Sequence, residues 1–317
     1  MKAMQPSVTP GLPDIYPSRC ESRPRILARQ DPVVHGVGHP PPVTLEKIAA
    51  YERDGFMFLP SMFSADEVQT LADETARLLR DGVQSASGNW IQEKHSEEKR
   101  SLFAAHTLEP VFSSLAADSR IVDIAEFILG GRVYVHQSRI NFKPRFKGRE
   151  FYWHSDFETW HIEDGMPRMR ALSVSISLTE SNVHNGPLML IPGSHKHYVA
   201  CVGETPDEHY KESLQKQDYG VPDPESLLFL SKGNGLAAPT GPAGSVVIFD
   251  CNTMHGSNSN ISPYPRASAF LVYNSMENRL RPPFCGKAPR PEFIASRRRA
   301  EAVRSSAVDY SKIGRGQ

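Results

Sequence analysis

The feature that most constrains the fold is a change in hydrophobic periodicity at Arg132. Before this residue apolar side chains recur at helical spacing, and after it they alternate with polar ones as they do on β-strands. Turn residues such as Asn185-Gly186-Pro187 separate the alternating segments. Strands are expected at 132–143, 151–157, 171–178, 188–191, 245–249 and 267–273. This pattern predicts a mainly β fold with flanking helices, arranged as an antiparallel sandwich or jelly roll.

Helices are expected ahead of the strands. Residues 44–53 fit a short helix that Gly55 ends, and 56–60 fit a strand. Ser64 and Glu67 form a capping-box pattern that begins a helix running to Gly82. Two more helical segments follow, the first from Pro110 and the second over 119–129, where Gly130-Gly131 is a stop signal. The polar stretch 83–107 is expected to be a loop, either mobile and near a site opening or simply solvated.

The expected organisation is one domain with two extensions. Residues 1–43 are rich in proline and predict an extended N-terminal arm. Residues 44–295 form the single predicted domain, in which 202–240 is a polar insertion between strands. Residues 296–317 form a basic C-terminal tail, expected to be solvated.

Composition excludes several classes of function. Lys plus Arg (36) equal Asp plus Glu (36), so the net charge near zero predicts neither a nucleic-acid partner nor an anionic membrane surface. The four cysteines are scattered without a CxxC pair, which favours reduced thiols. The first residues lack the apolar core of a secretory signal, and no apolar run is long enough to span a bilayer. We expect a cytoplasmic protein.

A possible metal site lies at His154-Ser155-Asp156. If residues 151–157 form a strand, His154 and Asp156 point to the same face. His255, which follows the strand 245–249, would complete a set of two histidines and one carboxylate. Such a set suits ferrous iron and leaves coordination positions open. The alternative for His255 taken alone is a hydrogen-bonded structural histidine.

Arg266 is a candidate for binding a carboxylate such as the distal one of 2-oxoglutarate. A guanidinium can bind a carboxylate through two parallel hydrogen bonds, and Ser268 shares its strand face. The alternative is a surface arginine in an ion pair.

Residues 132–143 supply a second set of polar side chains. Strand alternation places Gln137, Arg139, Asn141 and Lys143 on one face, which either lines a cavity for a polar ligand or faces solvent. Aromatic residues also gather near the candidate site, either as core or as a pocket for a small ring with delocalised positive charge. They are Phe151, Trp153, Phe157, Trp160, Phe249 and Phe270.

These motifs together resemble the ectoine hydroxylase family within the phytanoyl-CoA dioxygenase-like superfamily. The most specific is FYWHSDFETWHIEDGMPRMRALS at 151–173. HQSRINFKP at 136–144, NGPLMLIPGSHK at 185–196, FDCNTMHGSNSNISPYPR at 249–266 and PRPEFIASR at 289–297 are similar too. The resemblance covers nearly the whole chain, and the arm and the 202–240 insertion are the parts without an assigned chemical role.

The resemblance implies a double-stranded β-helix (jelly-roll, cupin-like) core and a homodimer. It implies catalytic iron, Fe(II), bound by His154, Asp156 and His255. It implies 2-oxoglutarate contacts from Lys143, Arg266, Asn141, Phe151 and Ser257, and ectoine contacts from Gln137, Arg139, Trp160 and Phe270.

The implied activity is a dioxygenase reaction that uses O2 and 2-oxoglutarate. It hydroxylates the compatible solute ectoine to 5-hydroxyectoine, releases succinate and CO2, and serves the osmotic stress response. Asp156 argues against a halogenase, in which the carboxylate gives way to halide. The alternatives are a sister hydroxylase for another small zwitterion, a non-catalytic compatible-solute binding protein, and a metal-dependent hydrolase or isomerase.

Overall fold

The computed structural model describes residues 13–36, 38–81, 87–93, 97–214 and 219–313. Within them, antiparallel strands form sheets of seven, three and two strands. The large sheet has the order β2 (Phe56–Leu59), β10 (Val246–Asp250), β7 (Ala171–Ser177), β12 (Arg266–Ser275), β5 (Val133–Lys143), β4 (Lys99–Phe103) and β3 (Trp90–Gln92). The second sheet is β6 (Phe151–His154), β11 (His255–Ser257) and β8 (Leu188–Leu190), and β1 (Arg25–Ala28) pairs with β9 (His197–Ala200).

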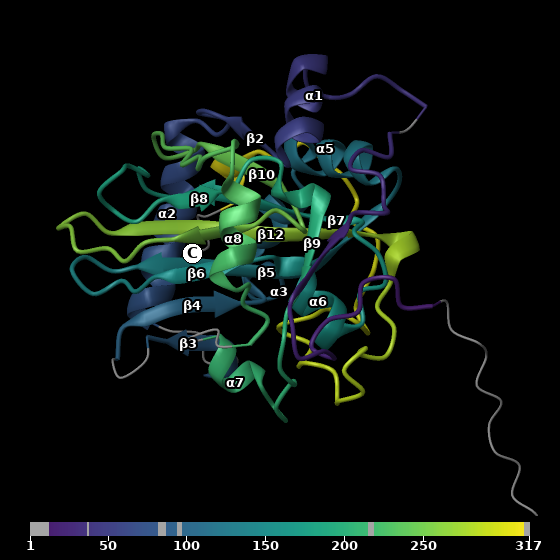
Figure 1. Ribbon diagram of the computed structural model, residues 1–317. Coiled ribbons are helices and arrows are strands. Elements are labelled where there is room, and N and C mark those ends of the chain that lie inside the picture. The colour runs from purple at the N-terminus through teal and green to yellow at the C-terminus, as the bar shows by residue number, and fades with distance from the viewer. Residues whose placement is uncertain (1–12, 37, 82–86, 94–96, 215–218, 314–317) are drawn as a thin grey trace, which may run out of the picture.

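Helices flank these sheets. They are α1 (Leu45–Asp54), α2 (Ala65–Asp81), α3 (Ala105–Leu108), α4 (Pro110–Ala117), α5 (Ser119–Leu129), α6 (Asp156–Asp164), α7 (Tyr210–Ser213) and α8 (Pro224–Ser231). In the view of Figure 1, α8 lies in front of the strands and α2 lies behind them. No helix among the described residues is long and apolar enough to cross a bilayer. The mainly β class with flanking helices is confirmed.

Strand alternation divides the core into two layers. On β10, Val246 and Ile248 pack with α2, α4 and α5 in the largest apolar cluster, while Val247 and Phe249 face the other way. There they meet Leu188 and Leu190 of β8, together with Phe270 of β12. The small sheet therefore faces the large one across a second core, and helices cover the opposite face.

The helix signals that precede the strands are confirmed. The capping box forms reciprocally, since the Ser64 amide donates to Glu67 Oε2 at 2.7 Å and the Glu67 amide donates to Ser64 Oγ at 3.3 Å. Gly55 and Gly130 adopt the left-handed conformation that ends α1 and α5.

The prediction of one strand over 151–157 is wrong beyond His154. Ser155 is the extended residue before α6, and Asp156 is the first residue of that helix. Acidic side chains are favourable in a first helical turn, where the free amides carry partial positive charge, and α6 has Asp156 and Glu158 there. Gly165 ends the helix in the left-handed conformation. Apolar alternation gave no sign of this turn from strand to helix.

The prediction of a loop over 83–107 is also wrong in the described part. Residues 90–92 and 99–103 form the hairpin β3–β4, and β4 pairs with β5 at the edge of the large sheet. Glu93 and Arg100 are buried there as an ion pair with a nitrogen–oxygen distance of 2.9 Å. Buried pairing offsets part of the cost of burying these charges, and so a polar stretch can become part of the sheet. Residues 82–86 and 94–96 lie outside the described residues.

Both predicted extensions pack against the domain where they are described. The arm contributes β1 and the fully buried Tyr16, and Arg29 pairs with Asp250 at 2.7 Å. The C-terminal tail is not simply solvated, because Tyr310 is 3% exposed and its hydroxyl donates to Asp118 at 3.0 Å. Whether the chain divides functionally at residues 43 and 295 stays a prediction.

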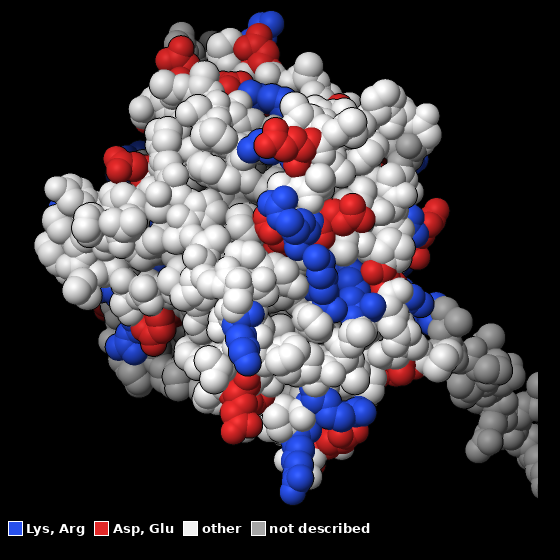
Figure 2. Space-filling model, turned by 45° about the horizontal axis from the view of Figure 1, so that its top comes forward, with Lys and Arg blue, Asp and Glu red and all other residues white. Residues whose placement is uncertain are grey.

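Charges of both signs are mixed on the surface. On the face that Figure 2 shows, Lys and Arg lie among Asp and Glu, with large uncharged areas and one short row of basic side chains between them. None of the four cysteines, all of them described, forms a disulfide.

The packing of the tail can be tested at Tyr310. Tyr310→Ala should lower the free energy of unfolding by about 3 kcal/mol, because it opens a cavity beneath α2 and removes a hydrogen bond from the buried Asp118. The exposed Lys312 offers a matched control in Lys312→Ala. Chemical denaturation of both variants measures the difference, and equal stabilities would show that the tail does not support the core.

Candidate metal centre

The two candidate histidines are brought together by the pairing of β6 with β11. In that register His255 lies directly opposite His154, and their ring centroids are 4.3 Å apart. Each imidazole is oriented by its own backbone: His154 Nδ1 donates to the Tyr152 carbonyl at 2.6 Å, and His255 Nδ1 donates to the Thr253 carbonyl at 3.0 Å. Because a carbonyl can only accept, Nδ1 carries the proton and the Nε2 lone pair is free to bind a metal.

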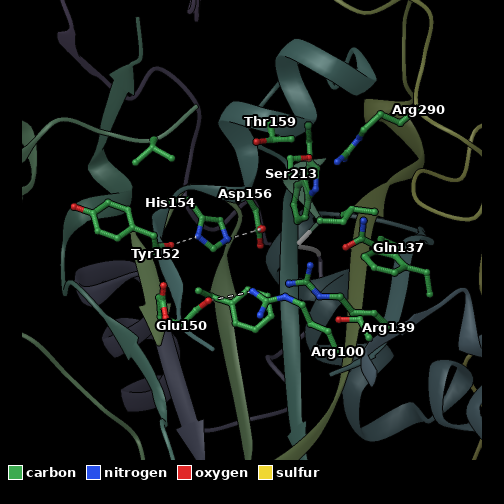
Figure 3. A pocket seen from close by; sticks show the side chains of 16 residues that line it. Arg100, Gln137, Arg139, Glu150, Tyr152, His154, Asp156, Thr159, Ser213 and Arg290 are labelled. Atoms are coloured by element: carbon green, nitrogen blue, oxygen red, sulfur yellow. Dashed lines mark hydrogen bonds and ion pairs between the residues drawn. The ribbon is translucent and has the colours of Figure 1, made fainter. Parts of the chain in front are cut away.

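Asp156 completes the cluster from the first turn of α6. Its Oδ1 lies 3.7 Å from His154 Nε2, and its Oδ2 lies 3.8 Å from His255 Nε2. Ser173 of β7 donates to Oδ2 at 3.2 Å. Figure 3 shows His154 and Asp156 side by side at the edge of a pocket. The structure thus unites the predicted residues, although Asp156 comes from a helix and not from the strand that carries His154.

Burial and mutual proximity set the charge of the cluster. Burial, together with the neighbouring His255, lowers the pKa of His154 from 6.5 to about 4. Burial lowers the pKa of His255 as well. Burial alone would raise the pKa of Asp156, but His255, His154 and Arg139 outweigh it, so that pKa is lowered. Neutral imidazoles beside an ionised carboxylate are the protonation states that metal binding requires.

The donor set fits a divalent transition metal. One ligand atom from each residue lies within 4.8 Å of the others, as expected of three atoms around one ion. Among the described residues this group contains no fourth histidine, cysteine or carboxylate. Two imidazoles and one carboxylate with no fourth protein ligand are typical of non-haem ferrous iron, whereas structural zinc favours four closed positions.

A cavity of about 320 Å³ opens on one side of the cluster. Its walls come from β4, β5, β6, α6, the end of α7 with the segment after it, and the C-terminal region, so the two larger sheets and the helices contribute. The lining residues are Arg100, Ser101, Phe103, Gln137, Arg139, Glu150, Phe151, Tyr152, His154, Asp156, Thr159, Trp160, Ser213, Leu214, Val221 and Arg290. This volume suits a small polar metabolite.

A smaller cavity lies on the His255 side and shares Arg139, Phe151 and His154 with the larger one. Its other walls come from β5, β8, β11 and β12. They are Asn141, Leu188, His255, Gly256, Ser257, Arg266 and Phe270. The His–Asp–His cluster therefore stands between two spaces that have different linings.

Arginines with an unpaired buried nitrogen line the cavities, among them Arg139 in both and Arg266 in the smaller one. The Nε atoms of Arg139 and Arg266 are buried and have no hydrogen-bond partner. Burial lowers the pKa of Arg266 to about 10 and also lowers that of Arg139. Burial, with Arg266 and Arg100 nearby, lowers the pKa of Lys143 from 10.5 to about 6. Unpaired buried cations are costly, so these groups indicate sites for anionic ligands.

The structure places most of the predicted co-substrate residues around the smaller cavity. Asn141, Phe151, Ser257 and Arg266 line it, and Arg266 Nη1 donates to Ser268 Oγ at 3.0 Å. Lys143 lines neither cavity; its ammonium donates to the Arg149 carbonyl at 2.8 Å and also to that of Asn258.

The predicted substrate residues divide between the two spaces. Gln137, Arg139 and Trp160 line the larger cavity. Phe270 lines the smaller one, with the Arg139 guanidinium 5.0 Å from its ring centroid. Of the other aromatic candidates, Phe157 and Phe249 are fully buried core residues.

Two cavity arginines were missed by the sequence reasoning. Arg100 stacks on Phe151, with 3.7 Å from guanidinium carbon to ring centroid, and it was hidden in the supposed loop 83–107. Arg290 reaches the cavity from the C-terminal region and pairs with the buried Asp164. The apolar pairs Trp90-Ile91 and Leu102-Phe103 on either side of a charged run were the available signal for the β3–β4 hairpin.

Comparison with known proteins gives consistent matches. Residues 51–268 match the family described as phytanoyl-CoA dioxygenase (PhyH). The chain is 55% identical to the ectoine dioxygenase of Sphingopyxis alaskensis over 92% of this chain and 95% of that protein. It is 48% identical to the ectoine dioxygenase of Halomonas elongata over 89% of this chain and 86% of that protein.

Solved structures agree. The crystal structure of EctD from S. alaskensis with 2-oxoglutarate and 5-hydroxyectoine has a TM-score of 0.85 and 49% identity, covering 94% of this chain and all of that one. The structure of the same protein with bound Fe has a TM-score of 0.84 over the same coverage. The epimerase SnoN, at 20% identity and a TM-score of 0.58, shares the fold.

Removing one imidazole should abolish metal binding without unfolding the chain. Loss of a residue that only supports a metal ligand weakens metal binding roughly 10- to 100-fold. His154→Ala removes a proposed ligand itself, so it should weaken Co²⁺ binding by more than this. His184→Ala, at an exposed histidine, is the matched control. Calorimetric titration with circular dichroism measures both properties, and unchanged Co²⁺ affinity in His154→Ala would remove this residue from the ligand set.

The lowered imidazole pKa values predict an acid-tolerant metal site. A protonated imidazole cannot bind a metal, so affinity falls once the pH drops through the pKa of the ligands. Because the pKa of His154 is about 4 and that of His255 is also lowered, Co²⁺ affinity should change little from about pH 7 to about pH 5. Titrations across this range measure it. A steep loss of affinity just below about pH 6.5, the ordinary histidine pKa, would contradict the expectation.

Proposed function

We infer the reaction from the premise that the chain belongs to the phytanoyl-CoA dioxygenase (PhyH) family and, within it, to the ectoine dioxygenases. The chain is an iron- and 2-oxoglutarate-dependent dioxygenase that hydroxylates ectoine to 5-hydroxyectoine. The single observation that carries this conclusion is the His154–Asp156–His255 cluster standing between two cavities with different linings.

We propose that His154, Asp156 and His255 hold the ferrous ion. When bound, it supplies the activation of O2 that a hydroxylation requires, with 2-oxoglutarate as the reductant. The protein holds the two imidazoles neutral and fixes their Nε2 atoms through the Tyr152 and Thr253 carbonyls. Ser173 steadies the carboxylate.

The smaller cavity is the proposed site of 2-oxoglutarate. The distal carboxylate of 2-oxoglutarate pairs with Arg266. The guanidinium of Arg266 is buried, has no partner at Nε and donates from Nη1 to Ser268 Oγ. Asn141, Phe151 and Ser257 line the same space. Lys143 lies outside this cavity, and its pKa is lowered to about 6 by burial with Arg266 and Arg100 nearby, so a dianion bound beside Arg266 would favour its protonated form.

The larger cavity is the proposed site of ectoine, a ring with a delocalised cation and a carboxylate. Arg139 supplies an unpaired cation for the carboxylate, and the Trp160 face suits the ring. Gln137, held by its donation to the Ile294 carbonyl at 2.8 Å, lines the same wall. Phe270 does not line the larger cavity. It contributes to the ectoine site indirectly, because its ring packs against the Arg139 guanidinium.

The overall reaction balances with one molecule each of ectoine, 2-oxoglutarate and O2. One oxygen atom enters the new hydroxyl group, and the other enters the carboxylate of succinate as CO2 leaves. Enclosing the ring between the sheets and α6 excludes bulk water and fixes the carbon that reacts.

Two alternatives predict different products. A sister hydroxylase would consume 2-oxoglutarate only with another small zwitterion, and a binding protein would hold ectoine without releasing succinate. The jelly-roll description of the core, the homodimer, the role in osmotic stress and the cytoplasmic location stay predictions.

The test is incubation of the chain with ferrous iron, 2-oxoglutarate and ectoine in air. Mass analysis should show ectoine gaining one oxygen atom, with succinate formed in equal amount. Succinate release that ectoine does not stimulate, or ectoine recovered unchanged, would overturn the proposal.

Arg266→Ala tests the site of the co-substrate. Losing a charge-assisted pair costs about 1.5–3 kcal/mol, so the KM for 2-oxoglutarate should rise roughly 10- to 100-fold. Co²⁺ affinity should stay unchanged, because Arg266 does not belong to the ligand cluster. Arg145→Ala, in an exposed loop, is the control for charge loss. An unaltered KM for 2-oxoglutarate would assign Arg266 another role.

A further inference from the structure

Helix α6 carries three parts of the site on nine residues. Asp156 at its start is a candidate metal ligand, and Trp160 in its middle lines the larger cavity. Asp164 at its end accepts two hydrogen bonds from Arg290, from Nε at 2.7 Å and Nη2 at 2.5 Å. Any shift or rotation of α6 therefore moves the metal site and one cavity wall together.

The N-terminal arm contacts this helix at several points, and one guanidinium binds two of its carboxylates. Arg19 Nε and Nη2 donate to the two oxygens of Glu158 at 2.9 and 2.7 Å, and its Nη1 donates to Glu163 at 2.7 Å. The side chains are almost completely enclosed, at 2% exposure for Arg19 and Glu158 and 4% for Glu163. Ser18 adds a further donation to Glu158 at 2.7 Å.

Burial makes this contact decisive for the position of α6. Two carboxylates on one short helix are removed from water, and Arg19, from outside the predicted domain, pairs with both of them, while His209 also contacts Glu163. Unpaired buried carboxylates are strongly unfavourable, so without Arg19 the helix would have to move or admit water. A bidentate guanidinium also fixes direction, which a lysine ammonium does not.

The same cluster holds the segment that completes the larger cavity. Arg19 Nη1 also donates to Thr205 at 3.1 Å, and His209 Nδ1 lies 2.9 Å from Glu163 Oε1. A Cβ atom at Gly220 would collide with both Glu158 and Arg19, so the chain passes directly over the ion pair. The next residue, Val221, lines the cavity. The cluster thus joins the arm, α6 and the 202–240 insertion at one buried point.

We propose that Arg19 is a positioning residue for this reaction, and that the N-terminal arm completes the active site. By fixing α6 through Glu158 and Glu163, Arg19 sets Asp156 for the metal and Trp160 with Val221 for the substrate. The smaller cavity is built on β5, β6, β8, β11 and β12, which Arg19 does not contact, so the arm controls one side of the metal centre and not the other. The substrate part of this proposal rests on the proposed function, but the metal part does not.

Arg19→Met and Arg19→Lys test the proposal in the full chain, after circular dichroism has shown that each variant is folded. Arg19→Met should weaken Co²⁺ binding about tenfold in the absence of both substrates, as loss of an outer-shell partner does. Its KM for ectoine should rise by about the same factor, while the KM for 2-oxoglutarate stays within about twofold at saturating metal. Arg19→Lys keeps the positive charge but loses the bidentate geometry of the guanidinium. Its Co²⁺ affinity and its KM for ectoine should therefore lie between those of Arg19→Met and the unaltered chain.

Arg25→Met is the matched control, because Arg25 lies on the same arm in an exposed pair with Glu21. If Arg19→Met does not fold, Glu158→Gln gives the second test, since it keeps Arg19 paired with Glu163 and should weaken Co²⁺ binding in the same direction. Folded variants that keep both Co²⁺ affinity and the KM for ectoine would overturn the proposal. A rise in the KM for 2-oxoglutarate as large as that for ectoine would also overturn it, because it would indicate that the whole active site is disturbed. Co²⁺ titration decides the metal part even if ectoine is not the substrate.

Discussion

The site depends on one short antiparallel pairing, that of β6 with β11. It places His154 and His255 opposite each other across the small sheet, and backbone carbonyls fix the orientation of both rings. The chain then turns from strand to helix within one residue, so that the first carboxylate of α6 points back at the same two nitrogens. A shift of one residue in this register would send one imidazole to the other face of the sheet and leave Asp156 with a single partner.

Around this centre the charges are arranged for ligands that the chain does not itself contain. Arg139 and Arg266 have buried, unpaired nitrogens, and burial depresses the pKa of Lys143 to about 6. Asp156 is the one carboxylate among the three cluster residues. A dication on the cluster would repel Arg139 and Arg266, whereas a dianionic co-substrate beside it would attract the dication and these arginines. The metal and 2-oxoglutarate should therefore stabilise each other in the site.

Much of the fold was predictable because local rules and tertiary structure agree. The capping box at Ser64 and Glu67 and the glycine ends of α1 and α5 are local, and they formed as expected. Alternation on β5 correctly grouped Gln137, Arg139 and Asn141, which line the cavities. His255 was proposed as the partner of His154 because it follows a predicted strand of the same fold, and the resemblance to the ectoine hydroxylases implied the same ligand set.

The rest depended on tertiary contacts. Asp156 was assigned to a strand because nothing in alternation shows that α6 begins there. The segment at Arg100 appeared solvated because its charge is cancelled by Glu93, a partner that only the folded hairpin brings close. Arg19 was assigned to an extended arm without a structural role for the same reason, since Glu158 and Glu163 lie far along the chain. In the last two cases a buried ion pair made a polar sequence part of the structure.

The most direct test of this account is a crystal structure grown without oxygen in the presence of ferrous iron and 2-oxoglutarate, with anomalous diffraction at the iron edge. The account predicts one strong anomalous peak within bonding distance of His154, Asp156 and His255, and the distal carboxylate of 2-oxoglutarate paired with Arg266. A peak at another place, or an ion closed off by a fourth protein ligand, would contradict it.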